Sequence, residues 1–331
     1  MRGWLAELAL ILLAGAVFAA ATSVAFSAAW PALAAWLRRL AAPAPRAWVA
    51  LAVALAPALV AVALVAICLA PGLAAPFGSH GDHCLAHTEH PHLCLTHHGA
   101  LSAPLSALLI AAAAISLGVL VRLAVQLVHA RRRGVILERA SAGRLAPGVT
   151  LVHSARPFSL AAGLLRPHIW ISTALVDALE SEQLAVVLAH ERGHVRRRDA
   201  LCRWAAAACS LPLWPSVRRA LLAELSLASE QACDEAAVVR VSDRLHVAET
   251  LLAVERLLGS GAGPAEPAGV LAFGGSTVPE RVRSLLAGPP AAVSLRYAAL
   301  AALGVPVVAA LGADRIHHAT EHLLGALLRL F

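Results

Sequence analysis

The chain has 331 residues, of which 59% are hydrophobic and only 14% are charged, and its formal net charge at pH 7 is +7. Its mean hydropathy of +0.73 lies far above the soluble average. This composition excludes an ordinary soluble protein and predicts a mainly α-helical integral membrane protein. No lysine is present and the arginines flank apolar segments, so the charge indicates membrane topology and not nucleic-acid binding, which we do not expect.

Apolar segments predict four transmembrane helices in contact with the lipid bilayer. The first carries no charge between Glu7 and Arg38, and this run is too long for a signal peptide. The second covers about Trp48 to Leu69 and the third about Leu101 to Val121. The fourth is predicted at residues 294–313.

The arginines predict how these helices are oriented. They lie between the first two segments and directly after the third, whereas the loop at 70–100 has neither Lys nor Arg. Charged sides are cytoplasmic by the positive-inside rule. We therefore expect a multi-pass protein of the inner (cytoplasmic) membrane with both termini extracytoplasmic. Its predicted parts are three transmembrane helices and a His-rich loop in residues 1–121, a cytoplasmic domain at 122–293, the fourth helix at 294–313 and an extracytoplasmic tail at 314–331.

An H-E-x-x-H motif runs from His190 to His194 inside a predicted helix that begins near Ser181, which we expect to be the N-cap. Residues four apart share one helix face, so both histidines can bind a single zinc ion. Glu191 lies beside them, where it can act as general base on a water whose pKa zinc has lowered. The motif indicates a hydrolase. The alternative is a pair of surface histidines, since the chain has 16 His.

A second helix, from about Ser216 to Arg240, supplies further acidic residues, and we expect Pro212 and Pro215 to end the first helix. Glu230 and Asp234 are four apart on one face of this second helix. Glu230 can complete a His2Glu site with one open position, while Asp234 can accept the second N–H of a ligating histidine. The alternative is that Glu230 is one acid among several on a solvated face.

The predicted extracytoplasmic loop is unusually rich in histidine. Together with Cys84 and Cys94 it holds His80, His83, His87, His90, His92, His97 and His98. Imidazole suits transition metals, so this loop is a possible second metal site. The alternative is a disordered polar loop closed by a Cys84–Cys94 disulfide.

Residues 148–153 and 168–173 have the β-branched pattern of strands and predict a small antiparallel hairpin or short sheet. The segment between them is a possible edge strand for binding an extended peptide substrate by strand addition. The candidate edge runs from Ser154 to Gly163, and its candidate residues are Ser154, Pro157, Phe158, Ser159 and Gly163. The alternative is a plain connecting hairpin. Further helices are predicted at 243–258 and 279–286, joined by a mobile linker at 259–269, with Arg281 and Arg283 expected to contact lipid headgroups.

Several of these stretches together resemble the BlaR/MecR-type membrane zinc metallopeptidases, the gluzincin family of antibiotic-sensing antirepressors. They are His190–Asp199, Glu230–Asp234, Pro157–Ser159, Arg166–Ser172, Ala248–Leu252, Ala272–Gly275, Arg281–Val282 and Leu285–Leu286. The resemblance covers roughly residues 120 to 290. It implies a zincin-like domain with one catalytic Zn²⁺, held by His190, His194 and Glu230, with Glu191 as base and Asp234 supporting a ligand.

The resemblance also implies a cytoplasmic protein substrate, with a transcriptional repressor as one candidate. It differs from the antibiotic sensors because only residues 314–331 follow the fourth predicted helix, which leaves no room for their penicillin-binding domain. The only tyrosine, Tyr297, is predicted in a membrane segment, so we consider His246 as the residue that stabilises the oxyanion. The alternative function is a non-proteolytic transmembrane metal sensor that uses the histidine-rich loop.

Overall fold

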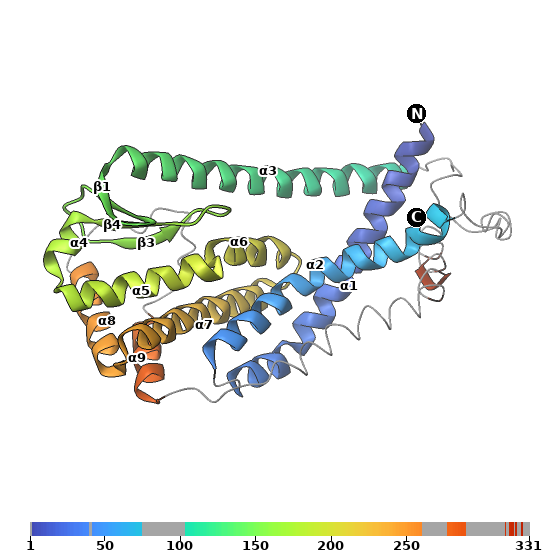
Figure 1. Ribbon diagram of the computed structural model, residues 1–331. Helices are drawn as coiled ribbons and strands as arrows, with labels where there is room; N and C mark the ends of the chain where they lie inside the picture. Colours follow the sequence, from blue (N-terminus) through green and yellow to red (C-terminus); the bar gives the residue numbers. More distant parts are fainter. Residues whose placement is uncertain are drawn as a thin grey trace.

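In a computed structural model the chain forms a set of helices with one small sheet (Figure 1). The structure describes residues 2–39, 42–74, 103–259 and 277–288, together with residues 315, 318–320, 322 and 326. The histidine-rich stretch 80–98, the linker at 260–269 and the predicted helix at 294–313 lie outside the described residues, as does most of the tail at 314–331.

Three long helices come first: α1 (Arg2–Arg39), α2 (Pro43–Ala74) and α3 (Ala103–Arg139). Among the described residues, two helices are long and apolar enough to cross a membrane, over Ile11–Arg39 and Pro43–Ile67. They support membrane association, whereas a complete set of four transmembrane helices stays a prediction. The third predicted segment forms the first half of α3, which continues as helix beyond Val121.

The sheet has four strands: β1 (Ser141–Ala146), β2 (Val149–Val152), β3 (Ser159–Ala162) and β4 (His168–Ser172). Their order is β1-β2-β4-β3, so β1 and β3 are the edges. The predicted short sheet is confirmed, but β2 and β4 are parallel, so the alternative of an antiparallel hairpin between these two segments is wrong. The intervening chain is held across the end of β4, where Phe158 N donates to Ser172 Oγ at 2.9 Å. It therefore continues as β3 on the far side of β4, and β3 and β4 form the antiparallel pair.

Within the described residues, six helices follow the start of the fourth strand and pack around the sheet or beyond it. They are α4 (Thr173–Ala178), α5 (Ser181–Arg197), α6 (Asp199–Cys209), α7 (Pro215–Val241), α8 (Arg244–Gly259) and α9 (Val278–Leu286). The N-cap of α5 is Glu180 and not Ser181, because Glu180 and Gln183 form a capping box. α5 ends at Arg197, where Arg198 adopts a left-handed conformation with φ of 53°. Pro212 and Pro215 therefore do not end that helix; Pro215 begins α7 instead.

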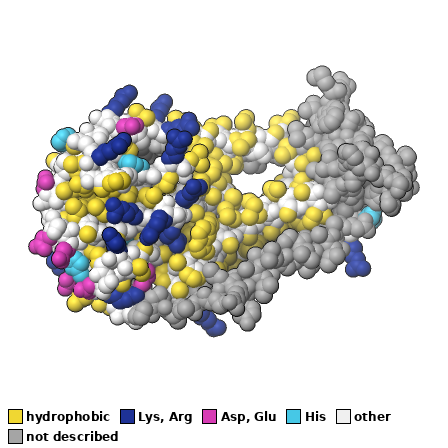
Figure 2. Space-filling view, viewed as in Figure 1, with side chains coloured by type: hydrophobic (Ala, Val, Ile, Leu, Met, Phe, Trp, Pro, Cys, Tyr) yellow, Lys and Arg dark blue, Asp and Glu magenta, His cyan; other side chains and the backbone are white. Residues whose placement is uncertain are grey.

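Helices α5 and α7 occupy the centre of the molecule. One face of α5 packs on the sheet through Val187, and another packs on α7 and α8 through Val186 and Ala189. α7 packs in turn against α2 and α6. Charged side chains gather over the sheet and the helices around it, whereas hydrophobic side chains cover the long helices (Figure 2). The two central helices therefore lie between a water-facing part and an apolar part.

Candidate metal centre

Helices α5 and α7 approach each other closely at Gly193, the fourth residue of the H-E-x-x-H motif. A Cβ atom there would lie 2.9 Å from Cys233 Sγ and 3.2 Å from Cys233 Cα. Real Cβ atoms essentially never show the shorter distance, so only glycine permits this spacing. The close packing brings the histidines of α5 against the acidic face of α7.

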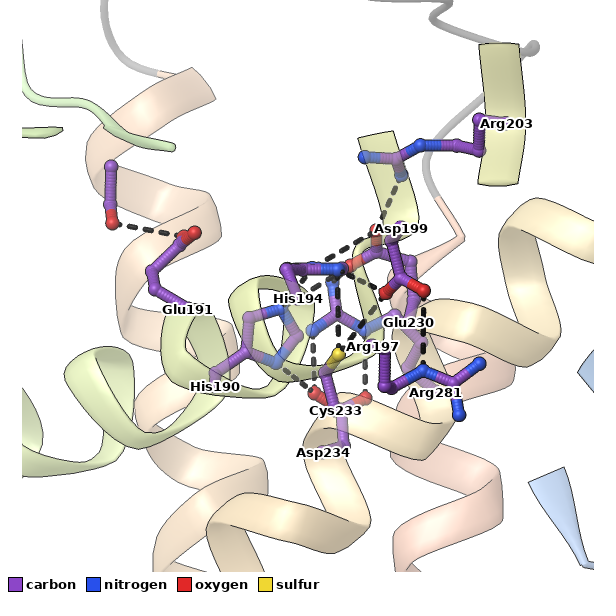
Figure 3. A network of polar contacts seen from close by, with 11 residues as sticks. His190, Glu191, His194, Arg197, Asp199, Arg203, Glu230, Cys233, Asp234 and Arg281 are labelled. Carbon is purple, nitrogen blue, oxygen red and sulfur yellow. Dashed lines mark hydrogen bonds and ion pairs between the residues drawn. The ribbon is translucent and has the colours of Figure 1, made fainter. Parts of the chain in front are cut away.

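The three predicted metal ligands lie together (Figure 3). His190 Nε2 is 3.1 Å from His194 Nε2 and 3.4 Å from Glu230 Oε2. His194 Nε2 is 3.5 Å from Glu230 Oε1. The possible ligand atoms all lie within 4.8 Å of one another, which is a spacing that one ion can bridge. Two imidazoles and one carboxylate are the donor set of many zinc enzymes.

Each imidazole is oriented by a buried carboxylate. His190 Nδ1 lies 2.9 Å from Asp234 Oδ1, and His194 Nδ1 lies 2.7 Å from Asp199 Oδ2. Both rings therefore present Nε2 to the centre of the site. Asp234 was expected beside a ligand, but no role was foreseen for Asp199. The signal available in the sequence was its position shortly after the motif. In the structure Asp199 begins α6, and its side chain is only 2% exposed.

Arg281 contributes an unexpected cation to the site. Its Nε and Nη2 donate to Asp234 at 2.8 and 2.6 Å, and its Nη1 lies 3.3 Å from Glu230 Oε2. The expectation that Arg281 contacts lipid headgroups is therefore wrong. The cause is the packing of α9, which buries Leu285 against α5 and α8 and turns Arg281 inward. A second cation, Arg203 of α6, lies 3.6 Å from Glu230 Oε1.

These contacts change the pKa values in the site. Burial would lower the pKa of His190, but hydrogen bonds to Asp234 and Glu230 outweigh it and raise this pKa. The charge of Glu230 and the hydrogen bond to Asp199 likewise outweigh burial and raise the pKa of His194 well above its usual value. Burial would raise the pKa of Glu230, yet His194, His190 and Arg281 hold it well below its usual range. The carboxylates thus make a centre that favours cations.

Glu191 points away from this cluster toward the sheet. It is 7% exposed, and Ser159 Oγ donates to its Oε1 at 2.9 Å. Ser159 begins the edge strand β3. The other predicted edge residues shape this strand: Ser154 Oγ donates to Arg156 O, and Gly163 makes a tight turn with φ of 109°. Pro157 and Phe158 are partly buried and lead into the strand. The predicted substrate edge therefore lies beside the predicted base.

His246 lies at the start of α8, where its backbone N–H donates to Asp243 Oδ1 at 3.0 Å. Its ring Nε2 is buried and has no hydrogen-bond partner within the described part of the chain. No hydrogen bond or ion pair among the described residues joins it to His190, His194 or Glu230. Its role as oxyanion donor stays a prediction. The second group of possible ligands, His194, Asp199 and Cys233, shares His194 with the first and belongs to the same site.

Comparison with known proteins adds one match. A family model described as BlaR1 peptidase M56 matches residues 97–285, which is more than half of the chain. The matched range contains both central helices, the sheet and every residue of the candidate metal centre described above. No curated protein and no solved structure matches the chain.

Proposed function

The chain belongs to the BlaR1 peptidase M56 family, and on this premise we propose that it is a zinc-dependent endopeptidase that cleaves a cytoplasmic protein at the membrane. The observation that carries the proposal is the convergence of His190 Nε2, His194 Nε2 and a Glu230 carboxylate oxygen within 4.8 Å. Surface histidines on a helix would not meet a partly buried carboxylate from another helix.

The residues present fit a zinc ion. His190, His194 and Glu230 would hold it, and three protein ligands leave the open position that catalytic zinc sites keep. Asp234 and Asp199 fix the ligating rings through their Nδ1 atoms. A bound zinc ion would supply a Lewis acid that polarises the scissile carbonyl and lowers the pKa of the attacking water.

The protein's own side chains move the protons. Glu191 accepts a proton from the attacking water and then transfers it to the leaving amine. Ser159 holds one oxygen of Glu191, which leaves the other oxygen for the water. An extended substrate adds to the free edge of β3, so that its scissile bond lies beside Glu191. His246 is the proposed donor to the oxyanion, because its buried Nε2 has no partner among the described residues.

The proposed substrate is a cytoplasmic protein, with a transcriptional repressor as the first candidate. This part of the proposal rests on the arginines at the ends of the predicted membrane segments, from which residues 122–293 are predicted to lie in the cytoplasm. It also rests on the resemblance to antirepressor peptidases. Cleavage of a repressor would link a signal at the membrane to transcription.

The test compares Glu191→Gln with the wild type after reconstitution in nanodiscs. New protein N-termini are counted by mass spectrometry after incubation with a cytoplasmic extract. We expect Glu191→Gln to lower cleavage by about 10²-fold or more while zinc content is unchanged. Glu182→Gln is the matched control, because Glu182 is exposed on the same helix. Undiminished cleavage by Glu191→Gln would show that the chain is not this kind of hydrolase.

A second candidate function is a non-proteolytic metal sensor. The observation that favours it is the histidine-rich stretch at 80–98, which the metallopeptidase mechanism does not use. Metal counting separates the two proposals. If the chain is the peptidase, His190→Ala should lose one bound ion per chain. If it is the sensor, the ions bound by the stretch at 80–98 should remain in this variant.

A further inference from the structure

The turn between α6 and α7 lies against the first long helix. We call residues Ser210–Trp214 the α6–α7 tip. Ser23 Oγ donates a hydrogen bond to Pro212 O, and Trp214 N donates to Ser27 Oγ at 3.4 Å. Both serines lie inside the apolar window Ile11–Arg39, Ser23 about four and Ser27 about three helical turns before its charged end at Arg38 and Arg39. The tip therefore reaches past the charged end of α1 to its apolar part, as the ribbon shows (Figure 1).

The backbone of the tip is suited to a medium without water. Ser210 N donates to Ala206 O, Leu211 N to Ala208 O and Leu213 N to Ser210 O. Trp214 N is bound by Ser27, while Pro212 and the following Pro215 have no N–H. Every backbone N–H from residue 210 to 215 thus has an acceptor. Irregular backbone in contact with lipid requires such pairing, whereas a turn in water does not.

Apart from the buried Ser210, the side chains of the tip are apolar, and two of them are exposed. No charged residue occurs between Arg203 and Arg218. Leu213 is buried against α2, but Trp214 is 66% exposed, and Pro212 and Pro215 are exposed beside it. An exposed tryptophan next to a candidate membrane helix is typical of the membrane interface, where indole rings lie at the level of the headgroups.

Arginines without anionic partners surround the tip. Arg218 and Arg219 lie in the first turns of α7, and burial together with the nearby Arg122 of α3 lowers the pKa of Arg218. Within the described ranges, no carboxylate lies within 4.0 Å of Arg122, Arg218 or Arg219. Arg218 Nε is buried without a hydrogen-bond partner in the same ranges. Arginine binds phosphate well, so this cluster is complementary to anionic headgroups.

We propose that the α6–α7 tip inserts into the membrane leaflet on the arginine-rich side, with Trp214 among the headgroups and Arg122, Arg218 and Arg219 bound to lipid phosphates. The inference does not depend on the proposed peptidase activity. An acidic protein segment would match the arginines equally well, but it would not explain an apolar tip that is bonded to α1. Glu230 follows Trp214 along the same helix, about 24 Å away. The metal centre is thereby held at a fixed height near the membrane surface.

The first test measures the surroundings of Trp214 in the full chain, reconstituted in nanodiscs that contain phosphatidylglycerol. The emission of Trp214 is obtained as the difference between the wild type and Trp214→Phe. We expect lipids with brominated chains to quench this emission by about half or more, and aqueous iodide to quench it weakly. Trp170→Phe is the matched control, because Trp170 is 8% exposed in the sheet and should respond to neither quencher. Strong iodide quenching without bromolipid quenching would overturn the proposal.

The second test removes the cations. We expect the double variant Arg218→Gln, Arg219→Gln to lose most of the extra thermal stabilisation that phosphatidylglycerol gives over phosphatidylcholine. The double variant Arg240→Gln, Arg256→Gln has the same change of charge at exposed positions away from the tip and should retain it. If the first variant keeps its lipid response but loses binding of a poly-glutamate peptide in detergent, the cluster is a protein-binding surface and the lipid proposal is wrong.

Discussion

The two ends of α7 handle polar groups in opposite ways. At Glu230 and Asp234 the helix carries a partly buried and a buried charge, and Arg281 together with the histidines of α5 provides a partner for each. At the α6–α7 tip the helix begins with exposed apolar side chains, and here it is the backbone N–H groups that all have acceptors. The difference shows that a buried charge needs a partner of opposite charge, and that an exposed apolar residue needs a neighbour that shields it from water. For the first end that neighbour is protein, and for the second we propose lipid.

The largest effect is expected from Arg281→Met, which removes the cation that contacts Glu230 and Asp234 at one end of this comparison. It leaves Asp234, whose side chain is 3% exposed, without its paired cation, and breaking such a pair costs about 3–5 kcal/mol. We expect the free energy of unfolding of the metal-free protein, measured with denaturant in detergent, to fall by that amount. Zinc affinity should fall by about tenfold or more, because both Glu230 and Asp234 lose a contact.

Arg244→Met is the matched control for Arg281. Arg244 binds Glu235 with both terminal nitrogens, at 2.8 and 2.6 Å, but this pair is more exposed and touches no proposed metal ligand. We expect it to cost about 1 kcal/mol or less and to leave zinc affinity unchanged. Equal effects of the two variants on both quantities would contradict a special role for Arg281.

A smaller effect is expected from Asp199→Asn. This variant removes the negative charge beside His194 while keeping the size and shape of the side chain, so it tests the charge alone at this end of α7. The variant weakens the hold on His194 Nδ1, and loss of such supporting contacts costs about 10–100-fold in metal affinity. Competition with a chromogenic chelator measures the zinc affinity. Asp177→Asn, at an exposed position of α4, should leave it unchanged. An unaltered affinity in Asp199→Asn would mean that His194 is held in place by packing alone.

The sequence located the proposed ligands better than the residues that support them, and helix periodicity explains why. His190 and His194, like Glu230 and Asp234, are four residues apart, so each pair must share a face wherever its helix lies. Asp199 and Arg281 act from other helices. Their roles depend on the left-handed Arg198, which starts α6 at a new angle, and on the docking of α9. No local pattern encodes either feature.

The same distinction applies to the fold. Residue patterns located both β2 and β4, because strand periodicity is local. Their parallel pairing follows from the path of the chain between them, which depends on hydrogen bonds such as that of Phe158 with Ser172. The expected end of α5 near the prolines failed for a similar reason, since the helix stops at a backbone conformation that Arg198 adopts without glycine. The α6–α7 tip was missed because its contacts join segments far apart in the sequence.

A further variant, Gly193→Ala, tests whether close packing of α5 and α7 is what brings the charges together. The new methyl group would lie 3.1 Å from Cys233 Cβ, so the helices must separate by several tenths of an ångström. Overpacking of this kind costs about 1–3 kcal/mol. We expect a lower free energy of unfolding and weaker zinc binding. Gly134→Ala, in α3 with nothing within 4 Å of the added atom, is the control and should be neutral or slightly stabilising.

The smallest effect is expected at the other end of α7, from Ser27→Ala. This variant removes the acceptor of Trp214 N–H, a bond of 3.4 Å, and hydrogen bonds between membrane helices average about 0.6 kcal/mol. The loss should be larger in nanodiscs than in detergent if the tip lies in lipid, because water in a micelle can replace the serine while the acyl region of a bilayer cannot. Thermal unfolding in both media measures the difference. Ser216→Ala, at an exposed position two residues after Trp214, controls for loss of a hydroxyl. Equal losses for Ser27→Ala in both media would mean that the tip is solvated, and the contrast between the two ends of α7 would disappear.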